Sequence, residues 1–258
     1  MVKLIGIPFD KKSSFLQGPA LAPVRIRQVL HNGSSNYWTE KLQNPIEHPD
    51  FSDGGDLTVE HYEDIEKELR QVLKPGVKLL SLGGDHSVTY PLIKVYKEVY
   101  GSFDILHIDA HGDLYQAFEG DPHSHACPFA RIMEEGLVNR LVQVGVRTLN
   151  PHQLEQAQRF GVEQITMLDF EEKWRSLEFN RPLYISMDLD GLDPAFAPGV
   201  SHHEPGGLST RQVLDLFHRV DAELIGADIV EYNPHRDVSD MTAAVAAKLL
   251  KELAAKMV

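Results

Sequence analysis

The chain has 258 residues, of which 42% are hydrophobic and 24% are charged, a composition typical of a soluble globular protein with a sizeable core. Its net charge of −13 would repel a phosphate backbone, so nucleic acid is not an expected partner. The lone cysteine, Cys127, excludes an intrachain disulfide, and no apolar run approaches the roughly 18 residues that a membrane span needs.

Apolar runs rich in β-branched residues alternate with segments of helical periodicity along the whole chain. In chain order, the runs predict six buried strands, at Leu4–Ile7, Val77–Leu82, Ile105–Ile108, Leu141–Val144, Leu183–Met187 and Leu224–Val230. The periodic segments predict six helices, at Thr58–Leu73, Tyr90–Val99, Pro128–Glu135, Pro151–Phe160, Thr210–Val220 and Thr242–Met257. Apolar strands that alternate with helices are typical of a parallel sheet covered on both faces. We therefore predict one α/β domain over residues 1–258, with three α/β/α layers and a mostly parallel sheet.

The start of the chain carries no targeting signal that we can identify. The stretch MVKLIGIP contains an apolar segment too short for the core of a signal peptide, and no small-residue cleavage site follows it. We therefore expect a cytoplasmic protein that does not associate with a membrane.

Three polar clusters stand where predicted strands end. They are residues 83–87 (GGDHS), residues 109–113 (DAHGD) and residues 186–194 (SMDLDGLDP). Open parallel sheets bind ligands in the crevice beyond the carboxyl ends of their strands. The three clusters are therefore expected to build one functional site.

Acidic and imidazole side chains in these clusters recur at intervals of two, which points them to one face of an extended backbone. His86 instead follows a Gly-Gly turn, where the backbone can adopt positive φ and aim the side chain sharply. Six side chains are therefore expected to face one crevice: His86, Asp109, His111, Asp113, Asp188 and Asp190. Four carboxylates packed together raise each other's pKa strongly unless cations compensate them. Two divalent cations balance four negative charges, and with only six ligands some carboxylates are expected to bridge. Oxygen-rich ligands with some imidazole suit Mn²⁺.

Neighbouring residues have simpler interpretations. We interpret His107 as a satisfied core residue on the opposite face of its strand, and Cys127 as a small buried residue rather than a nucleophile. Asp193, which precedes Pro194, is expected to cap or turn its loop. A single His or Asp is more often solvated than metal-bound, so the metal hypothesis depends on the three clusters together.

The three clusters resemble the signatures of the ureohydrolase (arginase/agmatinase) family, which read GGDHS, DAHxD and DxDxxDP. The resemblance extends from Gly6 to the C-terminal helix. Residues 124–131 (SHACPFAR), 198–209 (PGVSHHEPGGLS) and 231–234 (EYNP) are similar in particular to plant-type arginases and their bacterial relatives. Three ordered motifs in register are far more specific than one short pattern.

The resemblance implies an arginase-like fold, a homo-oligomer (trimer or hexamer) and a reaction that converts arginine to ornithine and urea. It implies two Mn²⁺ per chain, one on His86 and Asp113, one on His111 and Asp190, with Asp109 and Asp188 bridging. By the same resemblance, His125 is a proton shuttle, Glu231 binds the guanidinium group, and Asp113 also carries a proton. Simpler roles for two of these residues are a helix cap for His125 and an ion pair with Arg236 for Glu231.

The substrate is less clearly indicated than the reaction. The loop 114–123 offers His123, Tyr115 and Gln116 as donors to an α-carboxylate, but Glu119 and Asp121 beside them would favour the ammonium of agmatine. Arginine is the expected substrate, and agmatine or another guanidino or formimino compound is the alternative. A metal-dependent deacetylase of related fold and a non-catalytic binding protein are alternatives of another class. Gly112 stands where related sequences usually carry a larger residue, which predicts a looser loop.

Overall fold

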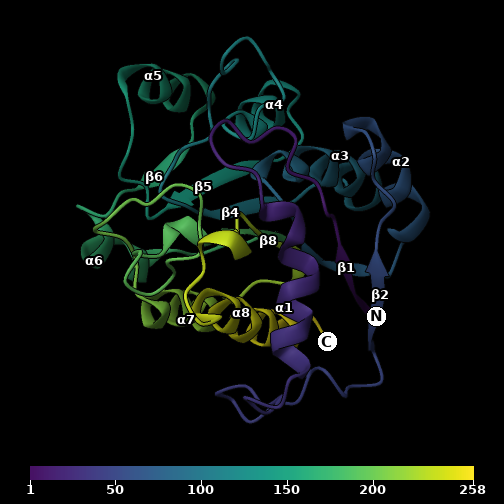
Figure 1. The fold of residues 1–258 in the computed structure, drawn as a ribbon. Helices are drawn as coiled ribbons and strands as arrows, with labels where there is room; N and C mark the ends of the chain where they lie inside the picture. Colours follow the sequence, from purple (N-terminus) through teal and green to yellow (C-terminus); the bar gives the residue numbers. More distant parts are fainter.

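The computed structural model describes residues 1–258. It contains eight strands: β1 (Val2–Gly6), β2 (Phe51–Asp56), β3 (Lys78–Leu82), β4 (Asp104–Ile108), β5 (Arg140–Val144), β6 (Glu163–Ile165), β7 (Leu183–Asp188) and β8 (Leu224–Val230). All eight pair in parallel in a single sheet with the order β2-β1-β3-β8-β7-β4-β5-β6 (Figure 1). The predicted parallel sheet is confirmed.

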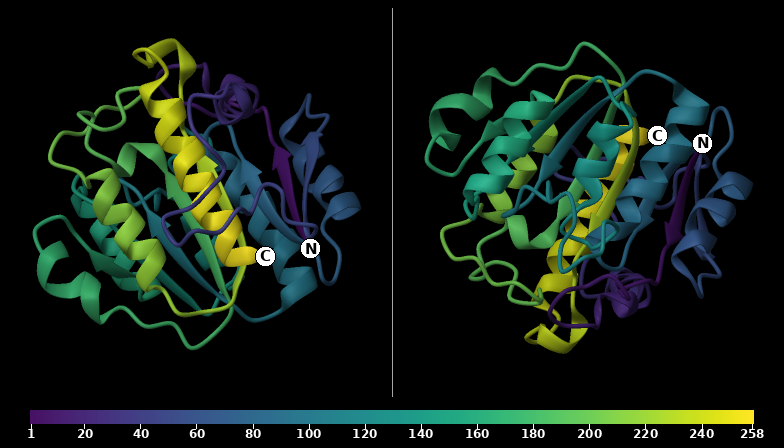
Figure 2. Two further views of the ribbon diagram at one scale, coloured as in Figure 1. Left: turned by 90° about the horizontal axis from the view of Figure 1, so that it is seen from below. Right: turned by 90° about the horizontal axis from the view of Figure 1, so that it is seen from above.

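Helices cover both faces of this sheet. They are α1 (Ala22–His31), α2 (Tyr62–Val72), α3 (Thr89–Tyr100), α4 (Pro128–Glu134), α5 (Pro151–Phe160), α6 (Phe170–Lys173), α7 (Thr210–Arg219) and α8 (Met241–Met257). One buried apolar cluster joins the sheet to α1, α6, α7 and α8, and a second joins it to α2, α3, α4 and α5. Figure 2 shows α7 and α8 side by side on the first of these faces. The predicted three layers are therefore confirmed.

Side chains alternate between the two clusters along each central strand, as the period of two requires. In β3, Leu79 lies in the second cluster and Leu80 in the first, and in β4 Ile105 and Leu106 do the same. Both faces of these strands are thus largely apolar, which is why their sequences are mostly apolar rather than alternating.

The predicted strands and helices are all present, with ends that differ by a few residues at most. The predictions missed β2, β6, α1 and α6. Strand β2 has the sequence FSDGGD, lies at the sheet edge and is largely exposed, so it has no apolar alternation to detect. Arg27 of α1 holds it instead, through ion pairs with Asp53 at 2.8 Å and Asp56 at 2.5 Å. Strand β6 and helix α6 span only three and four residues.

The four central strands, β3, β8, β7 and β4, place their carboxyl ends along one edge. Short 3-10 turns follow three of them: η2 (His86–Val88) after β3, η4 (Leu189–Gly191) after β7 and η5 (Pro234–Arg236) after β8. The motif residues therefore lie at the centre of the sheet edge. No helix in the structure combines the length and the apolar character needed to cross a membrane.

Candidate active site

The strand ends bring the six predicted ligands together. His86 follows β3, Asp109, His111 and Asp113 follow β4, and Asp188 and Asp190 lie at the end of β7 and in η4. Five of the six are buried and His111 is partly buried. Such a concentration of buried acids and imidazoles needs compensation by specific partners.

His86 points one ring nitrogen into a group of carboxylates. Its Nδ1 lies 3.0 Å from Asp188, 3.1 Å from Asp113 and 3.3 Å from Asp109. This nitrogen is buried and makes no hydrogen bond. The opposite nitrogen, Nε2, lies 3.0 Å from Ser186 Oγ, which in turn donates to Asp228 at 2.7 Å. Ser186 therefore acts as the acceptor for Nε2–H, which leaves a lone pair on Nδ1 aimed at the carboxylates.

His111 forms the second half of the cluster. Its Nδ1 lies 3.3 Å from Asp109 Oδ1 and 3.2 Å from Asp190 Oδ2. Asp109 thus turns Oδ1 toward His111 and Oδ2 toward His86. The cluster is therefore two half-sites that share one carboxylate, the arrangement that two bridged cations require.

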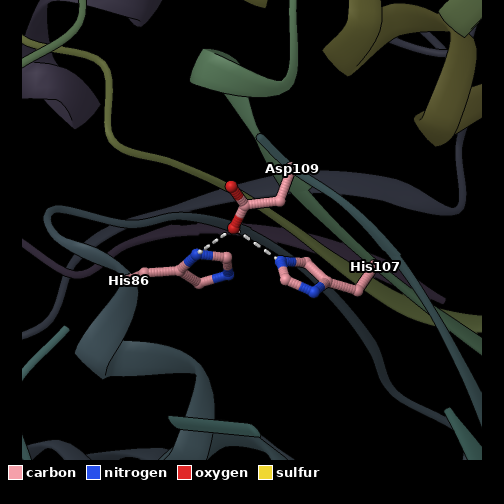
Figure 3. Close-up of side chains that lie close together, drawn as sticks. All are labelled: His86, His107 and Asp109. Atoms are coloured by element: carbon pink, nitrogen blue, oxygen red, sulfur yellow. Dashed lines mark hydrogen bonds and ion pairs between the residues drawn. The ribbon is translucent and has the colours of Figure 1, made fainter. Parts of the chain in front are cut away.

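Figure 3 shows His86 and His107 approaching the same oxygen of Asp109. His107 Nε2 lies 2.7 Å from Asp109 Oδ2, and its Nδ1 lies 3.0 Å from Gln143 Nε2. His107 is buried and satisfied, as predicted. The prediction that it faces away from the ligands is wrong, because it lies two residues before Asp109 and so shares its face.

The electrostatics of the cluster match a cation site. Burial and the charges of Asp190 and Asp109 raise the pKa of Asp188 well above its ordinary value. Burial likewise raises the pKa of Asp190 to about 6. Burial opposes charging of His86 and His111, but the carboxylates around them outweigh it and raise the pKa of both rings. Protons thus gather where divalent cations would otherwise bind, and the two compete for the same donors.

Glu231 and His125 pair directly beside this cluster. Glu231 Oε1 accepts hydrogen bonds from His125 Nδ1 and from the backbone N–H of His86, both at 2.8 Å. No protein donor reaches Glu231 Oε2, and the residue lines the cavity. Burial opposes charging of His125, but Glu231 outweighs it and raises the pKa of His125 to about 9. Glu231 therefore keeps one oxygen free for a cationic ligand.

Ser14 completes the environment of His125. Its backbone N–H donates to His125 Nε2 at 3.1 Å, and its hydroxyl lies 2.8 Å from the same nitrogen. The backbone donor needs a lone pair on Nε2 and so opposes charging of the ring, whereas Glu231 at Nδ1 favours it. A cation that paired with Glu231 would offset the carboxylate charge that raises the pKa of His125, and this pKa would then fall.

Two of these acids have strained backbone. Asp113 has φ of 49° and Glu231 has φ of 62°, in the left-handed region that non-glycine residues seldom adopt. Such conformations persist only where the surrounding structure imposes them, and they concentrate at functional sites.

A cavity of about 250 Å³ opens above the cluster. Tyr115, which the sequence predicted to contact substrate, lines this cavity together with His202 and Glu204. His123 does not line it. Its ring packs against Tyr62 and Tyr90, at centroid distances of 5.4 and 5.8 Å, beside a separate cavity.

The chain matches the Arginase family model over residues 1–255. It is 48% identical to mitochondrial arginase 1 of Arabidopsis thaliana, over 98% of this chain and 80% of that protein. The chain belongs to the arginase family. Its fold matches the structure of arginase from Medicago truncatula with a TM-score of 0.94 and 42% identity, over 99% of this chain and 87% of that one. It is also 41% identical to N(1)-aminopropylagmatine ureohydrolase of Thermus thermophilus, over 94% of this chain and 86% of that protein.

Within the arginase-family motifs, three neighbouring residues have structural roles. Cys127 is buried, and burial raises the pKa of its thiol to about 12, which disfavours a nucleophilic role. Asp193 accepts backbone hydrogen bonds from Ala195 and Gly206 at 2.9 and 2.6 Å, the loop-turning role predicted for it. The carbonyl of Gly112 accepts a hydrogen bond from Gln143 of β5 at 2.6 Å, which ties this part of the loop to the sheet.

A side chain at Gly112 would require two neighbouring side chains to move. A Cβ there would lie 2.8 Å from Gln153 Oε1 and 3.1 Å from Leu149. Gln153 occupies this space and lines the cavity.

Ser14 lines the cavity but was not predicted from the sequence. It lies in the loop 10–18, which has no motif or periodicity. Three contacts anchor this loop: Asp85 accepts from the Lys12 N–H at 2.9 Å, His125 N–H donates to Lys12 O at 3.2 Å, and Asp10 accepts from Gly18 N–H at 2.7 Å. Asp85 of the GGDHS motif, to which the sequence assigned no role, was the only hint that this loop lies at the site.

Proposed function

We propose that this arginase-family protein hydrolyses the guanidinium group of arginine to urea and ornithine. The observation that carries the proposal is the free oxygen of Glu231 beside the two half-sites that share Asp109. A guanidinium group is planar and carries paired donors, which carboxylates bind with charge-assisted hydrogen bonds. Agmatine is the alternative substrate.

We further propose two Mn²⁺ per chain. The donors fit, because His86 Nδ1 is buried without a hydrogen-bond partner among three carboxylates, and oxygen with imidazole suits this ion. His86 and Asp113 would hold one ion, His111 and Asp190 the other, with Asp109 and Asp188 between them. When bound, two such cations supply a nucleophilic water at neutral pH.

The protein's own groups then orient the substrate and move protons. Glu231 holds the guanidinium so that its carbon faces the cluster, and orientation of this kind lowers the barrier substantially. Asp113 accepts a proton from the attacking water and delivers it to the leaving amine, since an amine leaves only after protonation. Its strained backbone fixes the carboxylate beside His86. His125 exchanges protons with solvent through Nε2, next to Ser14.

Two alternatives of other classes are disfavoured. A deacetylase of related fold uses one metal, and a binding protein needs none, whereas all six donors are present and face one another. Elemental analysis of purified protein distinguishes the three classes, with two, one or no metal ions per chain. The cytoplasmic location stays a prediction; the Arabidopsis relative is named as a mitochondrial protein.

The decisive experiment is turnover of arginine and agmatine with Mn²⁺, measured as urea release and as kcat/KM for each compound. We expect arginine to be the better substrate. A clear preference for agmatine would reassign the substrate within the same reaction. The proposed function would be refuted if none of the guanidino compounds tested released urea.

A further inference from the structure

The outer part of the cavity carries one negative charge that the proposed chemistry does not use. Besides the metal-ligand candidates and Glu231, the only carboxylate that lines the cavity is that of Glu204, and no lysine or arginine side chain lines it. The Glu204 side chain is 37% exposed and accepts no hydrogen bond from the protein. It is therefore available to a cation that enters the cavity.

The backbone at Glu204 is clamped to the metal cluster. Arg147 Nε donates to the carbonyl of Glu204 at 2.9 Å, and Arg147 Nη2 donates to the carbonyl of Asp190 at 2.8 Å. One guanidinium thus fixes Glu204 relative to a predicted metal ligand. The Glu204 carboxylate lies 3.8 Å from His111 Nε2, on the side of the ring away from the cluster. A single imidazole ring therefore separates Glu204 from the place where the guanidinium reacts.

The two acids predicted to favour an ammonium, Glu119 and Asp121, lie outside the cavity. Glu119 is exposed and does not line the cavity. Asp121 also lies outside it and pairs with Lys12 at 2.7 Å. Glu204 is thus the acid that a substrate tail meets.

Neutral donors face the same space. Tyr115 Oη accepts from Asn150 Nδ2 at 2.6 Å, so its own hydrogen is free to point into the cavity. Gln153 accepts through Oε1 from Leu114 N–H, and its amide nitrogen has no protein partner. These neutral donors can bind a substrate that has a carboxylate. Because they carry no positive charge, they also accept a substrate without one.

We propose that Glu204 binds an ammonium group at the far end of the substrate, so that the substrates are ω-guanidino compounds that carry such an ammonium. The inference rests on the proposed function, since it assumes that the guanidinium end lies at Glu231. Arginine and agmatine both belong to this class, and 4-guanidinobutyrate, which has a carboxylate in place of the ammonium, does not.

The test compares Glu204→Gln with wild-type protein, both loaded with Mn²⁺, on arginine, agmatine and 4-guanidinobutyrate. Loss of one partly exposed charge-assisted hydrogen bond should lower kcat/KM for arginine and agmatine about tenfold, mainly through KM. 4-Guanidinobutyrate should be unaffected or improved. If it is not turned over, its inhibition constant against arginine gives the same comparison.

Glu119→Gln is the matched control, because it makes the same charge change on the neighbouring loop outside the cavity. It should leave all three compounds unchanged. A uniform fall in kcat for the three compounds in Glu204→Gln would overturn the proposal and show that Glu204 orients His111. Unchanged kinetics on arginine and agmatine would overturn it as well. Wild-type protein that releases no urea from any of the three would instead overturn the function on which the proposal rests.

Discussion

Ser186 lies behind the metal cluster and offers a direct test of how His86 is held. His86 Nε2 lies 3.0 Å from Ser186 Oγ, and Ser186 donates to Asp228 at 2.7 Å. Asp228 also accepts from Thr89 and Tyr184, each at 2.9 Å. A buried carboxylate with three donors thus anchors the serine, and the serine anchors the ring. We expect Ser186→Ala to weaken metal binding without touching a metal ligand.

The size of the effect follows from what the hydroxyl does. Its removal leaves Nε2–H of His86 without an acceptor at a site that is 0% exposed, which costs about 1–3 kcal/mol of stability. The ring avoids this cost by moving its hydrogen to Nδ1, where it opposes a cation. Loss of such a partner typically lowers metal affinity about 10–100-fold, which corresponds to about 1.4–2.8 kcal/mol.

The assay is urea release as a function of free Mn²⁺, set with a chelator buffer. The half-saturating concentration should rise about 10–100-fold in Ser186→Ala, while kcat at saturating Mn²⁺ stays close to wild type. Ser81→Ala is the matched control. Ser81 is also a buried strand serine in register with Asp228, but its hydroxyl has no hydrogen-bond partner. Equal Mn²⁺ dependence in Ser186→Ala and Ser81→Ala would refute the role of Ser186.

Asp188→Ala should abolish metal binding and urea release together, because the carboxylate is expected to serve both ions, and metal retained at two per chain would contradict this. His125→Ala should keep both metals and lower kcat about 10²–10⁴-fold, so loss of metal in this variant would argue against a shuttle. Because Glu231 raises the pKa of His125 to about 9, from an ordinary value near 6.5, the pair stabilises the metal-free fold below pH 6.5 and loses that contribution as the pH rises through 9. Chemical denaturation of chelated protein should therefore show a steeper fall in unfolding free energy over this range for wild type than for His125→Ala. The homo-oligomer expected from family resemblance should appear as a trimer or hexamer by light scattering, and a monomer would contradict it.

The central sheet and the metal cluster were predictable for one physical reason. Strands β3, β4, β7 and β8 are buried on both faces, so their sequences are mostly apolar, with a single buried Ser, His or Asp inside each, and polar motif residues follow most of them. The spacing of Asp109, His111 and Asp113 then follows from extended backbone. Strand β2 gave no such signal, because ion pairs with Arg27 rather than apolar burial hold it in place.

Several residues that line the cavity have no comparable pattern in the sequence. Ser14 comes from the loop after β1, Tyr115 from the loop after β4, Gln153 from α5 and Glu204 from the loop before α7. Each is positioned by a contact between segments distant in the sequence, as Arg147 positions Glu204. The acid that lay close in sequence to the catalytic residues, Asp121, is instead neutralised by Lys12 from another loop. The reaction chemistry in this fold can therefore be predicted from the residues at the strand ends. The choice of substrate depends instead on contacts between loops that are distant in the sequence and meet only in the folded structure.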